Sequence, residues 1–320
     1  MVPKTQNKQQ DFLFLALLNP MIYFTERDDC PICGSKNAKI IYNAPMYSGE
    51  IFSFVNTYYE EKIPHEVFSG NDFVIKQCQC GFVWQKNILN HEAMNQFYSK
   101  WISPEKSLIK RTEAPTTYYQ YIAKNIALLT NLINTKGSLS SFDFGMGWGH
   151  WAIMALGFGF ESYGLEITED RNQYAKVRGV KIIKSLLDSD TTFDLINAEQ
   201  VFEHIPNPRE VLENLILRLK THGILQIAVP NGEKEVWKMQ RKQWQVCKGA
   251  MQPLEHINTF TPKTLSNFVE SCGLKLIKKQ TYFNPVNGNL KILNLDPLPR
   301  SVFFKLQGCR MIFQKINLEI

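Results

Sequence analysis

Residues Phe142–Gly149 read FDFGMGWG, and this stretch decides the fold class. An expected strand, 141–144, runs into three glycines at alternate positions, and an expected helix, 150–157, follows directly. Glycine permits a tight turn and lets the backbone approach a ligand closely. The helix N-terminus behind the turn offers unpaired N–H groups. Such a turn can also be an ordinary strand-to-helix loop, so the surrounding chain has to decide.

Strand and helix patterns alternate after this turn. The expected strands are 141–144, 161–166, 180–184, 193–198, 223–229 and 274–280. The expected helices are 150–157, 169–178, 208–219 and 261–272, with two more at 90–101 and 116–132 before the turn. This alternation is typical of a parallel sheet covered on both faces. We therefore predict an α/β fold: a Rossmann-like, mostly parallel seven-stranded sheet with helices on both faces.

Composition allows two domains and favours no nucleic-acid partner. The chain has 320 residues, 44% hydrophobic and 21% charged, with a formal net charge of +6. That excess is modest and scattered, which is typical of a solvated surface. The apolar run Phe12–Phe24 is too short to span a bilayer and lacks a signal-peptide cleavage site. We expect it to pack on the protein, with a partner or a membrane surface as the alternative, and we expect no transmembrane segment.

Four of the seven cysteines come in two pairs, Cys30/Cys33 and Cys78/Cys80. An odd total without a secretion signal indicates a reducing compartment, so we expect a cytoplasmic protein. Four thiolates can close a tetrahedral, structural zinc site. The second pair has C-x-C spacing where C-x-x-C is usual, so one ligand could be strained or replaced, for example by His65. The alternative interpretation is four free thiols.

An acidic residue supports the glycine turn. Glu166 ends the next expected strand, where a carboxylate can accept both ribose hydroxyls of an adenosine cofactor. Asp143, before the glycines, can attract a cationic ligand. The G-x-G-x-G spacing after Asp143 resembles the class I S-adenosylmethionine methyltransferases. The resemblance implies that the methionine amino group lies near the turn and the ribose on Glu166. The cofactor-binding residues it implies are Asp143, Gly145, Gly147, Gly149, Glu166, Asp188 near the adenine, and Gln200.

The segment 193–205 reads FDLINAEQVFEHI, and in the family it opens the acceptor pocket beside the methyl donor. A hydroxyl or an enolisable carbon must lose a proton during methylation. We therefore interpret His204, with Glu203 beside it, as the general base. The alternative is that His204 caps or packs the helix. His256 is a second candidate, and Tyr118 and Tyr119 are candidate lid residues, although for each of these three we favour a packing role over a chemical one.

Five segments follow from these patterns: an apolar segment 1–24, a zinc-ribbon-like module 25–86, a helical linker or lid 87–135, the S-adenosylmethionine-binding domain 136–282 and an extension 283–320. The cysteine module before the glycine turn resembles sugar methyltransferases of glycan and natural-product gene clusters, which are usually longer. This resemblance implies C- or O-methylation of a small molecule, such as a nucleotide-linked sugar. Three alternatives remain: a quinone-type O-methyltransferase, a nucleic-acid-binding or RNA-modifying protein, and a binding module without catalysis.

Overall fold

The computed structural model describes residues 23–102, 109, 113–133, 137–187, 190–277, 279–284, 289–294 and 308–316. The chain forms two compact units. Unit 1 comprises residues 1–105 and 234–259, and unit 2 comprises 106–233 and 260–320. The expected segment 1–24 lies almost wholly outside the described residues, as does Asp188.

Unit 2 is built on a seven-stranded sheet with the strand order β12-β15-β10-β9-β6-β7-β8. Its strands are β6 (Ser140–Phe144), β7 (Glu161–Leu165), β8 (Lys181–Ile182), β9 (Phe193–Glu199), β10 (Leu219–Pro230), β12 (Leu274–Leu276) and β15 (Gly308–Lys315). Strands β10, β9, β6, β7 and β8 are parallel neighbours, whereas β15 pairs antiparallel with both β10 and β12. A separate hairpin joins β13 (Lys279–Asn284) to β14 (Asn289–Asn294). The predicted α/β fold with a mostly parallel seven-stranded sheet is confirmed.

The helices of unit 2 cover both faces of this sheet. They are α5 (Thr116–Thr130), α6 (His150–Gly157), α7 (Glu169–Lys176), α8 (Pro208–Leu217) and α10 (Pro262–Glu270), with a short 3-10 helix η3 (Phe202–His204). Successive strand residues point to opposite faces. Leu195 and Ile196 of β9 are both fully buried, so neither face of the sheet is open there. On one face, Ile126 of α5 and Trp151 of α6 pack in the same cluster as Leu195.

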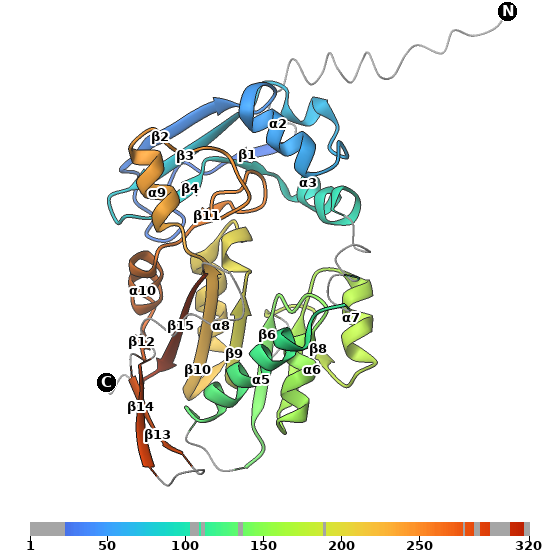
Figure 1. The fold of residues 1–320 in the computed structure, drawn as a ribbon, viewed down its shortest axis with the longest axis vertical. Coiled ribbons are helices and arrows are strands. Elements are labelled where there is room, and N and C mark those ends of the chain that lie inside the picture. The colour runs from blue at the N-terminus through green and yellow to red at the C-terminus, as the bar shows by residue number, and fades with distance from the viewer. Residues whose placement is uncertain are drawn as a thin grey trace, which may run out of the picture. The chain divides into compact units, whose positions relative to one another are not determined.

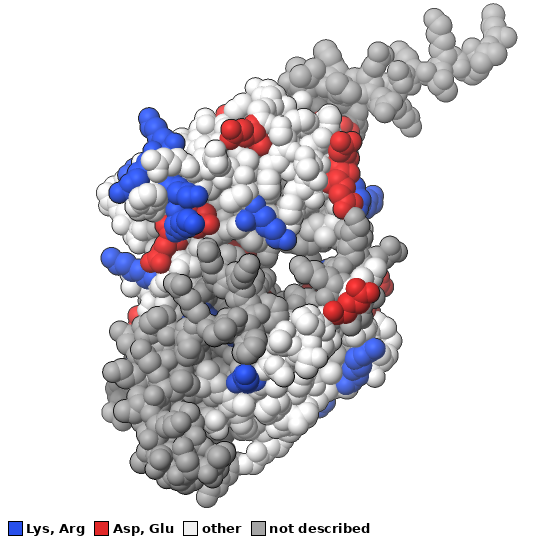
Figure 2. All heavy atoms as spheres, in the orientation of Figure 1, with Lys and Arg blue, Asp and Glu red and all other residues white. Residues whose placement is uncertain are grey.

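Unit 1 surrounds a four-stranded sheet, β11-β4-β3-β2, and a two-stranded sheet of β1 and β5. Its elements are β1 (Phe24–Glu26), β2 (Ala38–Pro45), α2 (Gly49–Tyr58), η1 (His65–Phe68), β3 (Asp72–Cys78), β4 (Val83–Gln85), β5 (Asn87–Leu89), α3 (His91–Gln96), η2 (Phe97–Trp101), α9 (Glu233–Gln240) and β11 (Asn258–Thr259). Figure 1 shows the orange segment 234–259 among the blue strands of this unit. The charge on the face shown in Figure 2 is mixed, with Lys and Arg side chains gathered over α9.

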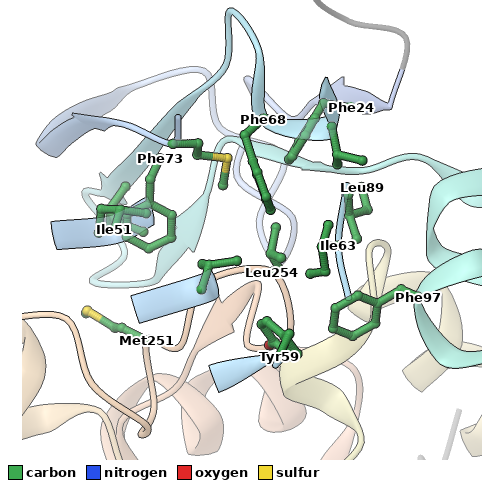
Figure 3. Close-up of a cluster of buried hydrophobic side chains, with 14 of the residues drawn as sticks. Phe24, Ile51, Tyr59, Ile63, Phe68, Phe73, Leu89, Phe97, Met251 and Leu254 are labelled. Carbon is green, nitrogen blue, oxygen red and sulfur yellow. The ribbon is translucent and has the colours of Figure 1, made fainter. Parts of the chain in front are cut away.

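The core of unit 1 joins segments that are far apart in the sequence. Figure 3 shows Met251 and Leu254 within the same apolar cluster as Phe24, Phe73 and Phe97. Each of these side chains is at most 2% exposed. Burial of this apolar area explains why 234–259 belongs to unit 1, whereas the sequence pattern grouped it with 136–282. Similarly, Gly308–Lys315 lies in the expected extension but supplies β15 of the central sheet.

No helix among the described residues combines the length and apolar character needed to cross a membrane.

Candidate cofactor site and cysteine cluster

The glycine turn leaves β6 at the carboxyl edge of the sheet, where open α/β folds bind ligands. Gly145 has φ +69°, and its N–H donates to the Leu165 carbonyl oxygen at 2.9 Å. A Cβ on Gly145 would lie 2.6 Å from Cγ2 of Val201, and one on Gly149 would lie 2.8 Å from Cβ of Ala175. These two glycines therefore allow close packing of the turn against Val201, which follows β9, and against α7.

Gly147 differs from Gly145 and Gly149 because a Cβ there would meet no atom within 4 Å among the described residues, its two chain neighbours aside. Its φ is +56°, a conformation that side-chain-bearing residues rarely adopt. The Cα of the middle glycine thus faces open space, with no side chain to keep a ligand away from it. This is the geometry expected of a turn that approaches a bound molecule closely.

Glu166 follows β7 and turns back toward the same glycine. Its Oε2 accepts the Gly147 N–H at 3.0 Å, and its Oε1 accepts the Ile167 N–H at 3.0 Å. Arg171 Nη1 lies 3.5 Å from Oε1, and the Glu166 side chain is 7% exposed. The carboxylate is therefore held in a fixed place beside the open space at Gly147. A fixed acidic acceptor at this strand end suits the ribose hydroxyls of an adenosine cofactor.

Asp143 lies on β6 and is 4% exposed. Burial raises the pKa of its carboxyl to about 7. Hydrogen bonds from Asn197 and from the Ala152 N–H lower this pKa, whereas the charges of Glu199 and Glu166 raise it. A buried carboxylate near neutrality can be ionised by a cationic ligand, because an opposite charge favours the charged form.

The segment just after β9 contains Gln200, whose backbone is strained, and His204, the candidate general base. Gln200 has φ +58°, and its N–H donates to the Ala228 carbonyl oxygen at 2.7 Å. Strained non-glycine residues of this kind cluster at functional sites. Beyond it, Nε2 of His204 lies 3.8 Å from Oε1 of Glu203, with the two side chains 23% and 1% exposed. A buried carboxylate at this distance stabilises a protonated imidazole.

The other sequence candidates pack differently. The Tyr118 and Tyr119 rings contact each other and the His150 ring. In unit 1, burial lowers the pKa of His256 to about 4, and its Nδ1 contacts the Gly249 carbonyl oxygen. His65 packs edge-to-face on Phe52.

Polar residues inside the apolar strands were not predicted. Asn197 of β9 donates from Nδ2 to Asp143 Oδ1 at 2.8 Å, and Gln226 of β10 donates to Asn197. Tyr121 and Arg310 both contact Oε1 of Glu199, at 2.9 and 2.8 Å. The sequence does contain a sign of these buried polar groups, because Asn197 interrupts the run FDLINAE and Gln226 interrupts the run ILQIAVP.

The four paired cysteines of unit 1 come together. Their Sγ atoms all lie within 4.8 Å of one another. The Cys30–Cys80 and Cys33–Cys78 sulfur distances are 3.8 and 3.6 Å. With Zn–S bonds near 2.3 Å, tetrahedral ligands stand about 3.8 Å apart, which the Cys30–Cys80 and Cys33–Cys78 separations match. Burial raises the pKa of the Cys30 thiol, and a cation would offset the cost of a thiolate there.

A Rossmann-like sheet, a glycine turn with an open middle position and an acid at the next strand end together define a class I S-adenosylmethionine-dependent methyltransferase domain. The chain belongs to the methyltransferase domain family, whose model matches residues 116–279, about half of the chain.

Two curated relatives are ubiquinone biosynthesis O-methyltransferases. The one from Colwellia psychrerythraea is 22% identical over 192 residues, covering 54% of this chain and 77% of the relative. The one from Rickettsia conorii is 30% identical over 113 residues, covering 32% of this chain and 39% of the relative, so the chain spans well under half of that protein. Among solved structures, magnesium protoporphyrin IX methyltransferase from Synechocystis PCC 6803 with bound SAH is 12% identical. That match covers 62% of this chain and 84% of the other, with a TM-score of 0.43.

Proposed function

We propose that this chain is an enzyme that transfers the methyl group of S-adenosylmethionine to a hydroxyl or carbon of a small molecule. One observation carries the proposal: the open space at Gly147 lies beside the fixed Glu166 carboxylate. The cofactor supplies an electrophilic methyl group when bound. Glu166 accepts from the ribose, Asp143 attracts the cationic amino group, and Gly145, Gly147 and Gly149 shape the turn. Asp188 and Gln200 complete the proposed cofactor site.

The acceptor loses its proton to His204 in this proposal. The imidazole of His204 is partly exposed, so an acceptor can reach it. The buried Glu203 carboxylate, 3.8 Å away, stabilises the imidazolium that forms through its opposite charge. Because a protonated imidazole cannot act as a base, turnover should fall at acid pH.

Two acceptor classes differ in their support. The printed names of the curated relatives favour a phenolic hydroxyl of a quinone precursor as the acceptor. The cysteine cluster of unit 1 favours the nucleotide-linked sugar, because that cluster carried the resemblance to sugar methyltransferases. We rank the phenolic hydroxyl first, since the relatives' names concern the reaction itself.

Transfer of labelled methyl groups tests the function. Purified protein is incubated with methyl-labelled S-adenosylmethionine and, separately, a catechol, a nucleotide-linked keto sugar and total RNA. We expect the native chain to transfer label to the catechol, and we expect the His204→Ala variant to transfer much less. The matched control is His91→Ala, which removes an exposed histidine of α3 in unit 1. Label in the sugar would reverse the ranking of acceptors, and label only in RNA would reject a small-molecule acceptor.

We further propose that Cys30, Cys33, Cys78 and Cys80 bind one structural zinc ion. The support is the close fit between the sulfur separations and tetrahedral coordination. All four positions would be filled by sulfur, so this zinc would have no open site for catalysis.

A further inference from the structure

A row of polar side chains crosses the sheet of unit 2 from strand to strand. Asp143 on β6 is the register partner of Asn197 on β9, and Asn197 is the partner of Gln226 on β10. Arg310 on β15 pairs with Ala228, two residues beyond Gln226 on the same face. We call Asp143, Asn197, Gln226 and Arg310 the polar ladder. It begins at the glycine turn and ends on β15, far away in the sequence.

Every hydrogen bond of the polar ladder runs in one direction. Arg310 Nη1 donates to Gln226 Oε1 at 3.3 Å. Gln226 Nε2 donates to Asn197 Oδ1 at 2.7 Å, and Asn197 Nδ2 donates to Asp143 Oδ1 at 2.8 Å. Hydrogen bonds in such a chain polarise one another in a low-dielectric interior. The Arg310 charge therefore polarises both amides so that the Asn197 N–H becomes a stronger donor to the Asp143 carboxylate.

The direction is fixed by two groups that can only donate. An arginine guanidinium has no acceptor, and neither has the indole N–H of tryptophan. Trp151 Nε1 donates to Asn125 Oδ1 at 3.1 Å, so the amide nitrogen of Asn125 must donate onward. It does so to Gln226 Oε1 at 2.7 Å. The Gln226 amide nitrogen donates one hydrogen back to Asn125 Oδ1 at 3.2 Å and the other to Asn197 Oδ1, and Asn197 in turn donates to Asp143.

Burying the Asn197 and Gln226 amides inside the sheet costs free energy of folding, which a functional role would explain. Asn197 and Gln226 are 1% and 0% exposed, within the buried runs 195–198 and 224–229, whose other residues are apolar. Buried amides are expensive in such positions unless every group is paired. Two aliphatic residues of similar volume would pack this part of the sheet without that requirement. The polar ladder therefore calls for an explanation beyond packing.

The Asp143 carboxylate accepts the last hydrogen bond of the polar ladder. The groups that face it are Asn197 and Glu199 from β9, the Ala152 N–H from α6, and Glu166 after β7. Glu199 and Glu166 oppose ionisation of Asp143, but each is countered by its own arginine. Arg310 Nη2 lies 2.8 Å from Glu199 Oε1, and Arg171 Nη1 lies 3.5 Å from Glu166 Oε1. Arg310 thus acts twice, by neutralising Glu199 and by heading the ladder.

We propose that Asn197, Gln226 and Arg310 are positioning residues that hold the Asp143 carboxylate oriented and ionised for the cationic amino group of the cofactor. This inference rests on the proposed function for its ligand, but not for its effect on Asp143. It also gives a role to β15, because this strand supplies the partly buried cation that donates to Gln226 and pairs with Glu199.

The test measures Asp143 directly and the cofactor separately. Carboxyl ¹³C NMR follows the ionisation of Asp143 in the free protein, assigned with Asp143→Asn. Calorimetry follows binding of S-adenosylhomocysteine between pH 6 and 8.5. Gln226→Met keeps the side-chain length but removes the hydrogen bonds of this residue to Arg310 and Asn197. Arg310→Lys keeps the positive charge but weakens the hydrogen bond to Gln226. Trp151→Phe removes only the orienting donor, which makes it the mildest variant. Gln85→Met is the matched control, because Gln85 is a buried glutamine of unit 1 with its own hydrogen bonds.

We expect Gln226→Met to raise the Asp143 midpoint by about one pH unit, because the charged form loses hydrogen-bond support. Affinity for S-adenosylhomocysteine should then fall about five-fold at pH 7 and recover toward pH 8.5, as the competent ionised fraction returns. Arg310→Lys and Trp151→Phe should shift the midpoint in the same direction, by less. Gln85→Met should lower the unfolding temperature without moving the midpoint.

Unchanged Asp143 midpoints in folded Gln226→Met, Arg310→Lys and Trp151→Phe would overturn the inference. If Gln226→Met fails to fold, Trp151→Phe decides the question. A shifted midpoint in a protein that binds no S-adenosylhomocysteine at any pH would reject the proposed function but support the ladder's effect on Asp143.

Discussion

The backbone N–H of Gly147 donates a 3.0 Å hydrogen bond to Oε2 of Glu166. This bond ties the middle of the glycine turn after β6 to the acid after β7. The two parts of the candidate cofactor site are therefore preorganised, and a ligand does not have to assemble them. Preorganised polar groups bind a ligand without first losing conformational freedom.

Glu166→Gln tests the acidic half of the site. The amide keeps the shape of the side chain but loses the negative charge, so its hydrogen bonds to ribose hydroxyls weaken. We expect about ten-fold weaker binding of S-adenosylhomocysteine, in line with the loss of a charge-assisted hydrogen bond. Calorimetry measures this, with Glu169→Gln on the exposed first turn of α7 as control. Equal affinities in the two variants would argue against a ribose role for Glu166.

Gly145→Ala tests how the turn packs. Its new Cβ would lie 2.6 Å from Cγ2 of Val201 and would also occupy a φ of +69°. We expect a loss of about 1–3 kcal/mol in the free energy of unfolding, as overpacking and strain usually cost. Val201→Ala should restore part of that stability in the Gly145→Ala background, although it destabilises the native chain. Denaturant unfolding measures both effects, and additive losses would show that the clash is not the cause.

Asp143→Asn tests the buried carboxyl through pH. Because the pKa of Asp143 is raised to about 7 in the folded chain, the folded state binds more protons than the unfolded state between about pH 4 and pH 7. This group therefore favours folding at acid pH, and that contribution is lost as pH rises toward 7. We expect Asp143→Asn to unfold at a higher temperature than the native chain at pH 8, with the difference vanishing below pH 4. An identical difference at pH 4 and pH 8 would contradict the assignment.

The cysteine cluster predicts a metal-dependent stability. We expect one zinc ion per chain by elemental analysis, reduced in Cys33→Ser, together with a lower unfolding temperature of that variant. Structural zinc contributes directly to folding free energy, so a strong chelator should have the same effect on the native protein. Cys247→Ser, at an exposed cysteine outside the cluster, is the control. Full stability and zinc content in Cys33→Ser would favour free thiols.

Much of the fold could be predicted because its strands are short, apolar and regularly spaced. The run Phe193–Glu199 and the glycine turn were recognisable from local pattern alone, since each follows local geometry. The placement of 234–259 in unit 1 was not, because the burial of Met251 and Leu254 depends on partners far away in the chain. A helical or strand period does not say which core an element joins.

In the candidate site too, some residues follow from local sequence pattern and others only from contacts between distant parts of the chain. Asp143, the glycines and Glu166 lie close together in the sequence and match a family spacing, so they could be proposed as candidates from the sequence; their cofactor role stays a prediction. Asn197, Gln226 and Arg310 meet only when β9, β10 and β15 become neighbours in the sheet. The sequence order β9, β10, β15 does not reveal that a strand from the last residues lies beside β10. Long-range strand pairing therefore set the limit of prediction.

Binding of S-adenosylmethionine to the native chain and to Gly147→Val tests the central claim most directly. The valine side chain would enter the open space at Gly147, where a Cβ meets no atom within 4 Å from the part of the chain that the structure describes, adjacent residues excepted. Gly159→Val is the control, because Gly159 also has a positive φ and an unobstructed Cβ position. The account predicts one bound molecule per native chain and per Gly159→Val chain, and no measurable binding to folded Gly147→Val. Absence of binding to the native chain, or equal binding to Gly147→Val, would contradict it.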